Sequence, residues 1–281
     1  MRIARRLFLY ALLSPAATFA QQTPSTTPAA SEPPVTPQAM TLRLDSVLRS
    51  VVRDGRVDYR GLRQNSAELR AYTTWLATHG PTATPTEFRS RDERMAYWLN
   101  AYNALVLQSV IDAPASMNNV MTFLPNSGFF RARSHRIDGR SLTLDHIENR
   151  EIRPVFHDPR VHVALNCAAR SCPPLHNRAF SSRDLSAQLT ARARAYVALP
   201  ASLSLDAPAH RARVSQLVQW FAEDFSANIP DCAPSTVRGP LRFFYQFASE
   251  SQRAALVTAC GEDGAGCTLS YVAYDWTLNA R

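Results

Sequence analysis

The chain has 281 residues, and 46% of them are apolar. Its formal net charge is +8, and all of its basic residues are arginine. The arginines are scattered and form no basic run, which argues against nucleic-acid binding. After the first 20 residues no segment is apolar enough to predict a membrane span. The length beyond residue 40 fits one large domain.

The first 20 residues are typical of a secretory signal. A basic head, Met1–Arg6, precedes an apolar run and a small-residue site that ends at Ala20. The apolar run is shorter than the roughly 20 residues that span a bilayer. We therefore expect cleavage near Ala20 and a periplasmic or secreted protein. Arg5-Arg6 also resembles the core of a twin-arginine signal, so general secretion and twin-arginine export both stay open.

Residues 21–39 are rich in Gln, Thr, Ser, Pro and Ala and have few large apolar side chains. Such a segment buries too little surface to fold, so it is predicted to be a disordered linker. The folded domain is then expected to comprise residues 40–281.

Apolar residues at helical spacing predict three helices in the first part of this domain, over residues 40–52, 66–79 and 91–111. The third helix has a capping box at its start, made by Ser90 and Glu93. A short extended piece over residues 57–59 lies between the first two.

After a loop over residues 113–128, Asp138-Gly139 predicts the turn of a hairpin. Thr143 is expected to cap a helix that ends before Pro154. Residues 161–165 are apolar with little alternation, which predicts a buried strand.

The remaining predicted elements are a helix from Ser181 or Ser182 to about Leu199, a hairpin over 203–214, helices over 215–225 and 240–258, and a closing strand over 271–276. Helices outnumber strands and do not alternate regularly with them. The expected fold is therefore α+β, a helix-rich single domain packed on a small, mainly antiparallel sheet.

The chain has five cysteines, so at least one stays unpaired within a monomer. Cys260 and Cys267 bracket a Gly-rich turn, which indicates a local disulfide. Two arrangements of Cys167, Cys172 and Cys232 remain open. Either Cys167 and Cys172 form a disulfide and Cys232 is free, or Cys232 pairs with one of them and leaves a free thiol in the central motif.

The central motif runs from Asp158 to Leu175 and contains Cys167 at the end of an apolar run. A thiol placed there could be a nucleophile, a disulfide partner or half of a redox pair. A nucleophile needs a base, and His162 and His146 are candidates. If residues 161–165 form a strand, His162 and Cys167 point to opposite faces. The cysteine spacing argues against a zinc site, so neither a metal nor a cofactor is expected.

Polar residues within two predicted helices are further candidates. Asn100 and Asn103 lie three residues apart, share a helix face, and could brace the turn at Cys167 or orient a substrate. Glu148 and Arg153 could form a structural ion pair, or Glu148 could orient a base or contact a substrate.

Five motifs in order resemble the DUF547 family of uncharacterised bacterial secreted proteins, which has relatives in plants and animals. They are Trp98-Leu-Asn100-Ala-Tyr-Asn103, Leu144-Asp-His-Ile-Glu148, Ile152-Arg153-Pro, Asp158 through Cys167 to Cys172-Pro-Pro, and Tyr274-Asp-Trp276. The resemblance spans about residues 44–279. It implies that Asn100, Tyr102, Asn103, Glu148, Arg153 and Cys167 form a shared polar core.

The resemblance also bears on the reactivity of Cys167. Plant relatives commonly have serine at the position of Cys172, which favours Cys167 as the active thiol. Family members usually have Glu-His where this chain has Glu148-Asn149. An asparagine cannot take up a proton near neutral pH, so this protein is a weakened or inactive member unless another histidine replaces it.

Our first hypothesis is a cysteine-dependent hydrolase or acyltransferase acting on amide or thioester bonds of a small molecule or peptide. Cys167 is the nucleophile, His162 or His146 the base, and Asn100 or Asn103 an oxyanion donor, with Glu148 in support. Tyr102, Arg153 and Cys172 are expected to contribute to binding. The alternative is a non-catalytic binding or scaffold module of the cell envelope.

Overall fold

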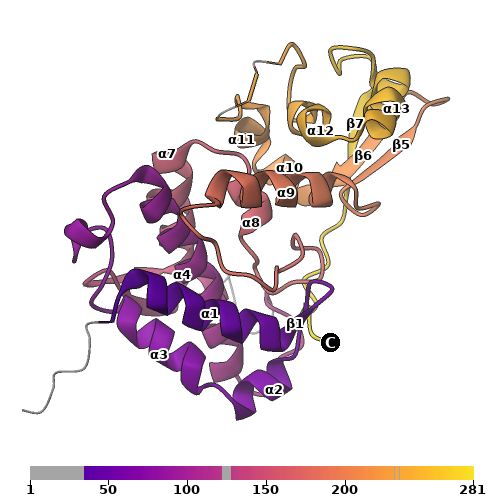
Figure 1. The fold of residues 1–281 in the computed structure, drawn as a ribbon. Helices are drawn as coiled ribbons and strands as arrows, with labels where there is room; N and C mark the ends of the chain where they lie inside the picture. Colours follow the sequence, from indigo (N-terminus) through magenta and orange to yellow (C-terminus); the bar gives the residue numbers. More distant parts are fainter. Residues whose placement is uncertain (1–34, 122–127, 231, 234) are drawn as a thin grey trace, which may run out of the picture. The chain divides into compact units, whose positions relative to one another are not determined.

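The computed structural model describes residues 35–121, 128–230, 232–233 and 235–281 (Figure 1). The expected signal peptide and all but the last residues of the expected linker lie outside this part. The longer helices are α1 (Pro37–Val51), α2 (Tyr59–Gln64), α3 (Ala67–Leu76), α4 (Arg91–Asp112), α9 (Leu185–Val197), α12 (Leu241–Phe247) and α13 (Glu250–Cys260). The shorter ones are α5 (Gly128–Arg131), α6 (Leu144–His146), α7 (Arg153–Phe156), α8 (Val161–Ala164), α10 (Gln216–Trp220) and α11 (Ala222–Ser226).

A 3-10 turn (Pro85–Glu87) and a π-helical turn (Ile147–Ile152) complete the helical part. The strands are β1 (Val52–Arg53), β2 (Arg56–Val57), β3 (Ser134–Ile137), β4 (Arg140–Thr143), β5 (Leu203–Asp206), β6 (Arg211–Ser215) and β7 (Thr268–Val272). The strands form small sheets, so the predicted α+β class is confirmed. Within the described residues, no helix combines the length and the apolar character needed to cross a membrane.

Helix α4 is the centre of the first hydrophobic core, and its residues from Met95 to Ile111 are all buried. The predicted capping box is present, because the Ser90 side chain accepts from Glu93 N–H and the Glu93 side chain accepts from Ser90 N–H. Helices α1, α2 and α3 pack beside α4 (Figure 1). Helix α1 begins at Pro37 because Thr36 caps it, so residues 37–39 of the expected linker are helical.

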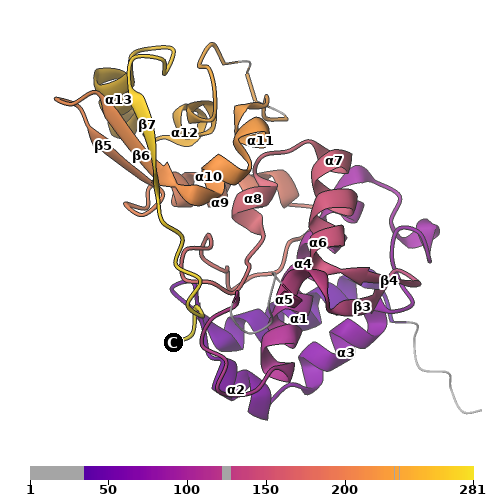
Figure 2. The same cartoon turned by 180° about the vertical axis from the view of Figure 1, so that it is seen from behind.

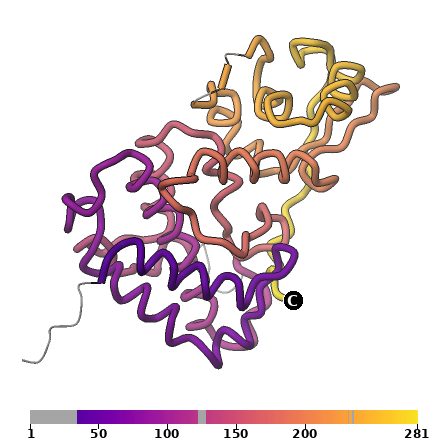
Figure 3. Tube along the Cα trace, in the orientation of Figure 1, coloured from indigo at the N-terminus to yellow at the C-terminus, as the bar shows by residue number. Residues whose placement is uncertain are grey.

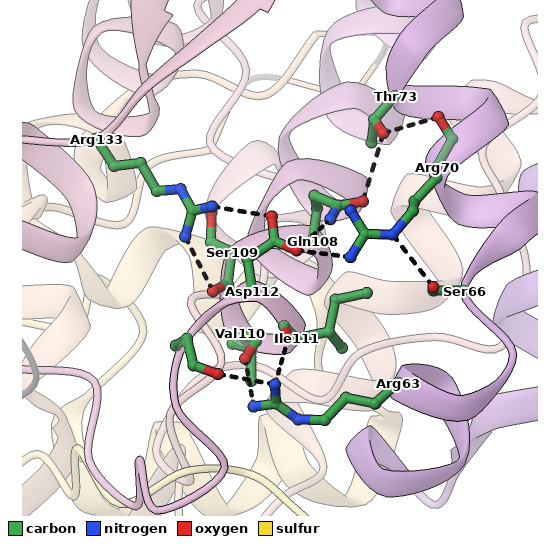
Figure 4. Close-up of polar contacts among 11 residues, drawn as sticks. Arg63, Ser66, Arg70, Thr73, Gln108, Ser109, Val110, Ile111, Asp112 and Arg133 are labelled. Atoms are coloured by element: carbon green, nitrogen blue, oxygen red, sulfur yellow. Dashed lines mark hydrogen bonds and ion pairs between the residues drawn. The ribbon is translucent and has the colours of Figure 1, made fainter.

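Arginines bind the C-terminal end of α4 (Figure 4). The Arg63 guanidinium donates to the carbonyls of Ala113 at 2.7 Å and Val110 at 2.8 Å, and also to that of Ile111. The carboxylate of Asp112 accepts from Arg70 at 2.8 Å and from Arg133 at 2.9 Å. The last carbonyls of a helix have no partners within it, and positive charge is favoured there. These contacts fix the helix that carries Asn100 and Asn103.

The predicted hairpin about Asp138-Gly139 is confirmed as β3 and β4, which pair antiparallel with Ile137 opposite Arg140. Asp138 and Gly139 both have positive φ angles, 53° and 71°, as a tight two-residue turn requires. The predicted hairpin over 203–214 is likewise present as β5 and β6.

The second core cluster lies among helices α9 to α13 and the sheet β5-β6-β7 (Figures 1 and 2). Strand β7 pairs parallel with β6 and ends at Val272, four residues before the end expected from the sequence. The chain then leaves this sheet and runs beside the first core. Its bridges there are Asn119 with Thr277, Ala169 with Leu278, and Val57 with Ala280. The last segment therefore contacts both core clusters.

The predicted strand over 161–165 was wrong, because residues 161–164 form the short helix α8. Asp158 starts this helix: its carboxylate accepts the backbone N–H of Arg160 at 3.0 Å and binds the Arg160 guanidinium at 2.7 Å. Every residue of α8 is buried, so the apolar run had no period that would distinguish a helix from a strand. The expectation that His162 and Cys167 point to opposite faces of a strand therefore does not apply, because there is no strand here.

Three other helices differ from the prediction in their bounds. The helix after Thr143 continues through Pro154 to Phe156, because proline is tolerated in the first turn of α7. The helix expected from residue 181 starts at Leu185. The helix expected over 215–225 is divided into α10 and α11 at Phe221.

Candidate functional site

Cys167 and Cys172 lie at disulfide distance, with Cα atoms 6.0 Å apart. Cys260 and Cys267 form the other pair, and Cys232 is free. The predicted disulfide at the Gly-rich turn is therefore confirmed. Of the two arrangements left open for the other cysteines, the structure has the first.

The turn that carries Cys167 is held by three asparagine side chains. Asn103 accepts from Asn166 N–H at 2.9 Å and donates to the Ala164 carbonyl at 3.0 Å. Asn166 in turn accepts from Ala168 N–H at 3.0 Å and from the Asn279 amide at 3.1 Å. Ala168 has a φ of 63°, a left-handed conformation that costs free energy for a residue with a Cβ. The asparagines therefore hold a strained turn next to Cys167.

The two sulfur atoms of this disulfide have different surroundings. Cys172 is buried, and its sulfur accepts the backbone N–H groups of Cys167 at 2.9 Å and Ala169 at 3.4 Å. Cys167 is half-buried and lines a pocket, and its sulfur lies 3.3 Å from the Tyr274 hydroxyl. A ligand in the pocket would therefore meet Cys167 first.

This pocket has a volume of about 430 Å³. Its wall includes Tyr102, Asp145, Glu148, Asn149, Cys167, Leu217, Trp220, Phe221, Tyr274 and Trp276. Three rings form one cluster in it, because Trp276 lies 4.5 Å from Tyr274 and 5.6 Å from Trp220, centroid to centroid. Trp220 is 43% exposed, so one side of the pocket is an accessible aromatic surface.

Glu148 is a carboxyl group in the wall of this pocket. Burial raises its pKa to about 7, although the charge of Arg153 and a hydrogen bond from Tyr102 oppose the shift. The Tyr102 hydroxyl donates to the Glu148 carboxylate at 3.3 Å. A carboxyl group with this pKa can both accept and release a proton near neutral pH.

His162 is bound to Asp224 and does not line the pocket. Its Nε2 lies 2.7 Å from the Asp224 carboxylate, and its ring stacks on Phe221 and Phe225 at 4.2 and 5.3 Å. Burial lowers the pKa of His162 although Asp224 opposes this. Asp224 had no recognisable signal in the sequence, because its partner is 62 residues away.

Arg153 binds Asp224 at 2.6 Å and the Asn149 side-chain oxygen at 2.6 Å. The proposed ion pair with Glu148 is thus replaced by these two contacts, while the positive charge of Arg153 still acts on Glu148. Asn149 therefore has a structural partner in Arg153.

The other predicted residues lie elsewhere. His146 is 43% exposed in its side chain and lies 3.3 Å from the Glu151 carboxylate. Asn100 both donates to and accepts from the Phe180 backbone at 2.8 Å, so it holds a different segment from Asn103. The structure therefore brings Cys167, Glu148 and Tyr102 together in the wall of one pocket. Cys172 is paired with Cys167, and Asn103 binds the backbone of the turn that carries Cys167.

Asp145, Trp220, Tyr274 and Trp276 line the pocket, but the sequence did not predict them as site residues. Tyr274 and Trp276 belong to the last of the five motifs, which was a usable signal. No histidine is found among the described residues that line the pocket. The described part of the chain also has no cluster of three or more His, Cys, Asp or Glu side chains able to hold a metal ion.

Comparison with known proteins agrees with the resemblance seen in the sequence. Residues 86–197 match the model of a family described as "Protein of unknown function, DUF547". The matched segment contains α4, Glu148 and both cysteines of the pocket disulfide, whereas Tyr274 lies beyond it. No curated protein and no solved structure matches the chain. Over residues 86–197 the chain is therefore similar to the DUF547 family.

Proposed function

We propose that the pocket beside Cys167 is the active site of an exported thiol enzyme, and that its reaction is thiol–disulfide exchange. The observation that carries this proposal is the difference between the two sulfur atoms. Cys167 faces the pocket, whereas Cys172 is buried and receives two backbone N–H groups. Exchange needs one sulfur that a substrate can reach and a second that leaves easily as a thiolate.

In the first step a substrate thiolate attacks the Cys167 sulfur. A bond forms between the substrate and Cys167, the bond between the two cysteines breaks, and Cys172 leaves as a thiolate. The N–H groups of Cys167 and Ala169 stabilise that charge. A second substrate thiol then attacks the mixed disulfide, which releases an oxidised substrate and Cys167. The protein disulfide is reduced to two thiols, and two substrate thiols are oxidised to a disulfide.

Glu148 is the proton acceptor in this scheme. Its pKa of about 7 lies close to that of a substrate thiol, for which about 8.5 is usual, so the carboxylate can take the thiol proton. The two substrate thiols release two protons in one turnover, and the Cys172 and Cys167 thiolates take up one proton each. The Tyr274 hydroxyl, beside the Cys167 sulfur, serves as a hydrogen-bond donor during the exchange.

Export is part of the proposal. Two cysteine pairs at disulfide distance support an oxidising compartment, as does the signal-like sequence of residues 1–20. In such a compartment a small-molecule disulfide such as glutathione disulfide would accept two electrons from the two thiols and re-form the pocket disulfide between catalytic cycles.

A second candidate function is the cysteine-dependent hydrolase or acyltransferase. It is favoured by the position of Cys167 in a pocket with a carboxyl group that can accept its proton. In the reduced protein Cys167 attacks an amide or thioester carbonyl, and Glu148 acts as the base in place of a histidine. The Tyr274 hydroxyl, 3.3 Å from the Cys167 sulfur in the same pocket, then serves as a donor to the oxyanion.

The reduction potential of the Cys167–Cys172 pair tests the first proposal. The Cys232→Ser protein is equilibrated in glutathione buffers, and the oxidised fraction of each pair is measured by thiol trapping and peptide mass spectrometry. We expect this pair to titrate between about −230 and −120 mV, as catalytic disulfides do. A potential below about −300 mV is that of a structural disulfide. It would overturn both enzyme proposals and leave the non-catalytic envelope module.

Two single-cysteine variants separate exchange from acyl transfer. With glutathione disulfide, Cys172→Ser should accumulate a mixed disulfide at Cys167, whereas Cys167→Ser should leave the buried Cys172 unmodified. With a small thioester, acylation of Cys167 in the reduced Cys172→Ser protein, followed by turnover, would favour the acyl-transfer enzyme over exchange.

A further inference from the structure

A second pocket, of about 480 Å³, lies behind the disulfide loop. Its walls come from the turn between β1 and β2, from the segment 173–178 that follows Cys172, and from helix α9. Gly55 of the turn packs so closely on this segment that a Cβ there would lie 2.4 Å from the Pro174 Cβ. The volume of this second pocket is in the range of small-molecule binding sites.

Arg192 of α9 lines this pocket and has no carboxylate partner among the described residues. Its guanidinium lies 5.1 Å from the centre of the Phe180 ring and 3.4 Å from the Pro174 carbonyl. Burial lowers the pKa of Arg192 to about 10. Arg192 is half-buried in the pocket wall, and a partly desolvated cation is favoured by a nearby anion, so the side chain is poised for a negatively charged partner.

The other charges of the pocket favour a single negative charge. Arg53 also lines it, and the Arg53 guanidinium donates to the Val52 carbonyl at 2.8 Å. Arg178 lines it as well, but binds Asp45 at 2.8 Å. Asp54 is the one acidic residue in the described wall. A monoanion fits this balance better than a doubly charged phosphate, which Asp54 would repel.

The rest of the wall has apolar side chains, with Val163, Leu175, Tyr196 and Leu199 among them, and the polar side chains of His176, Asn177 and Gln188. We infer that this pocket binds a small organic carboxylate, whose carboxyl group pairs with Arg192 and whose apolar body packs on the apolar side chains. The planar guanidinium can donate two parallel hydrogen bonds to a carboxylate. The inference is independent of the chemistry proposed at Cys167.

Titration calorimetry with octanoate tests the inference, with 1-octanol and inorganic phosphate as probes that each lack one part of the ligand. The variants are Arg192→Gln and, as the matched control on the same helix, Arg194→Gln, whose side chain is exposed. We expect octanoate to bind the unchanged protein and Arg194→Gln equally. Arg192→Gln should bind it about 10- to 100-fold more weakly, the range for a charge-assisted hydrogen bond.

The three probes separate the possible outcomes. Weak or no binding of octanol and phosphate, together with binding of octanoate, supports a site for organic carboxylates. Equal binding of phosphate and octanoate would overturn it, because the apolar wall would then have no role. Failure of octanoate to bind, or equal octanoate affinity in Arg192→Gln, would also overturn it. A thermal melt of Arg192→Gln without ligand shows that the variant is folded.

Discussion

The Tyr274 hydroxyl lies 3.3 Å from the Cys167 sulfur, although the two residues are 107 positions apart in the chain. Burial raises the pKa of Tyr274 well above its usual value, so the hydroxyl keeps its proton at physiological pH and remains a donor. The tyrosine comes from the segment after β7, and the cysteine from the turn after α8. The C-terminal segment therefore places a hydrogen-bond donor at the candidate reactive atom.

Replacement of Tyr274 by phenylalanine should slow the reaction of Cys167 with alkylating agents. The change removes the donor to the sulfur, and a hydrogen bond to a charged group contributes about 1.5–3 kcal/mol. The rate for the reduced Cys172→Ser protein is therefore expected to fall about 10- to 100-fold. Iodoacetamide labelling followed by mass spectrometry measures it. Tyr271→Phe is the control, and an equal effect there would contradict a specific contact.

Glu148→Gln should alter the pH dependence of stability. The folded protein holds the Glu148 proton up to a pH of about 7, whereas the usual pKa of glutamate is 4.5. This group therefore contributes stability that is fully present below pH 4.5 and is lost as the pH rises to about 7. Glutamine does not titrate, so the variant lacks this dependence of stability on pH. Relative to the unchanged protein, the variant should gain about 1–3 kcal/mol between pH 4.5 and 8, as denaturant melts will measure. A constant difference across this range would contradict the raised pKa.

The same variant should also change the pH dependence of exchange at Cys167. In the unchanged protein the rate is expected to rise with pH around 7, as Glu148 becomes ionised and able to accept a proton. With glutamine the inflection near pH 7 should disappear. Stopped-flow rates of mixed-disulfide formation measure this, and an unchanged pH profile would show that Glu148 takes no part.

Asn103→Ala and Asn100→Ala form a matched pair. Each removes one side chain that satisfies a backbone N–H and a backbone carbonyl in the interior. Both should lower the free energy of unfolding by about 2–4 kcal/mol, since an unsatisfied buried group costs about 1–3 kcal/mol. Because Asn103 binds the turn before Cys167 and Asn100 does not, only Asn103→Ala is expected to change the labelling rate of Cys167. Equal effects of both variants on labelling would show a general loss of structure.

Asp224→Asn should destabilise the protein above pH 4. Although burial alone would raise the pKa of Asp224, contacts with His162 and Arg153 hold it well below the usual 3.8. The carboxylate therefore contributes stability above this pH, and the contribution is lost as the pH falls further. We expect a loss of about 1–3 kcal/mol at pH 7 that shrinks below pH 4. Melts from pH 2.5 to 7 measure it, and Glu223→Gln, an exposed neighbour, should show no such trend.

Local patterns predicted the parts of the fold that local contacts determine. The capping box at Ser90 and the turn at Asp138-Gly139 depend on residues within a few positions, and both are present. The segment 161–165 gave the wrong element because burial on all sides removed its periodicity. The ion pair between Asp158 and Arg160 lies just before this helix, outside the apolar run on which the prediction was based.

The candidate site also contains residues that local patterns in the sequence predicted and contacts that they did not. Cys167 and Glu148 stood out because a cysteine after an apolar run and a glutamate in a polar cluster are unusual in themselves. The partner of His162 was not visible, since the contact between His162 and Asp224 joins residues 62 positions apart. The raised pKa of Glu148 also follows from burial in a pocket that only the folded chain forms.

The path of the C-terminal segment has a consequence for how the protein forms during synthesis. Asn279 donates to Asn166, 113 positions earlier in the chain, and Tyr274 and Trp276 line the pocket. A growing chain that already contains both cysteines still lacks the side chains that fix their turn. The pocket can therefore be completed only when the segment up to residue 279 has been synthesised and folds against this turn.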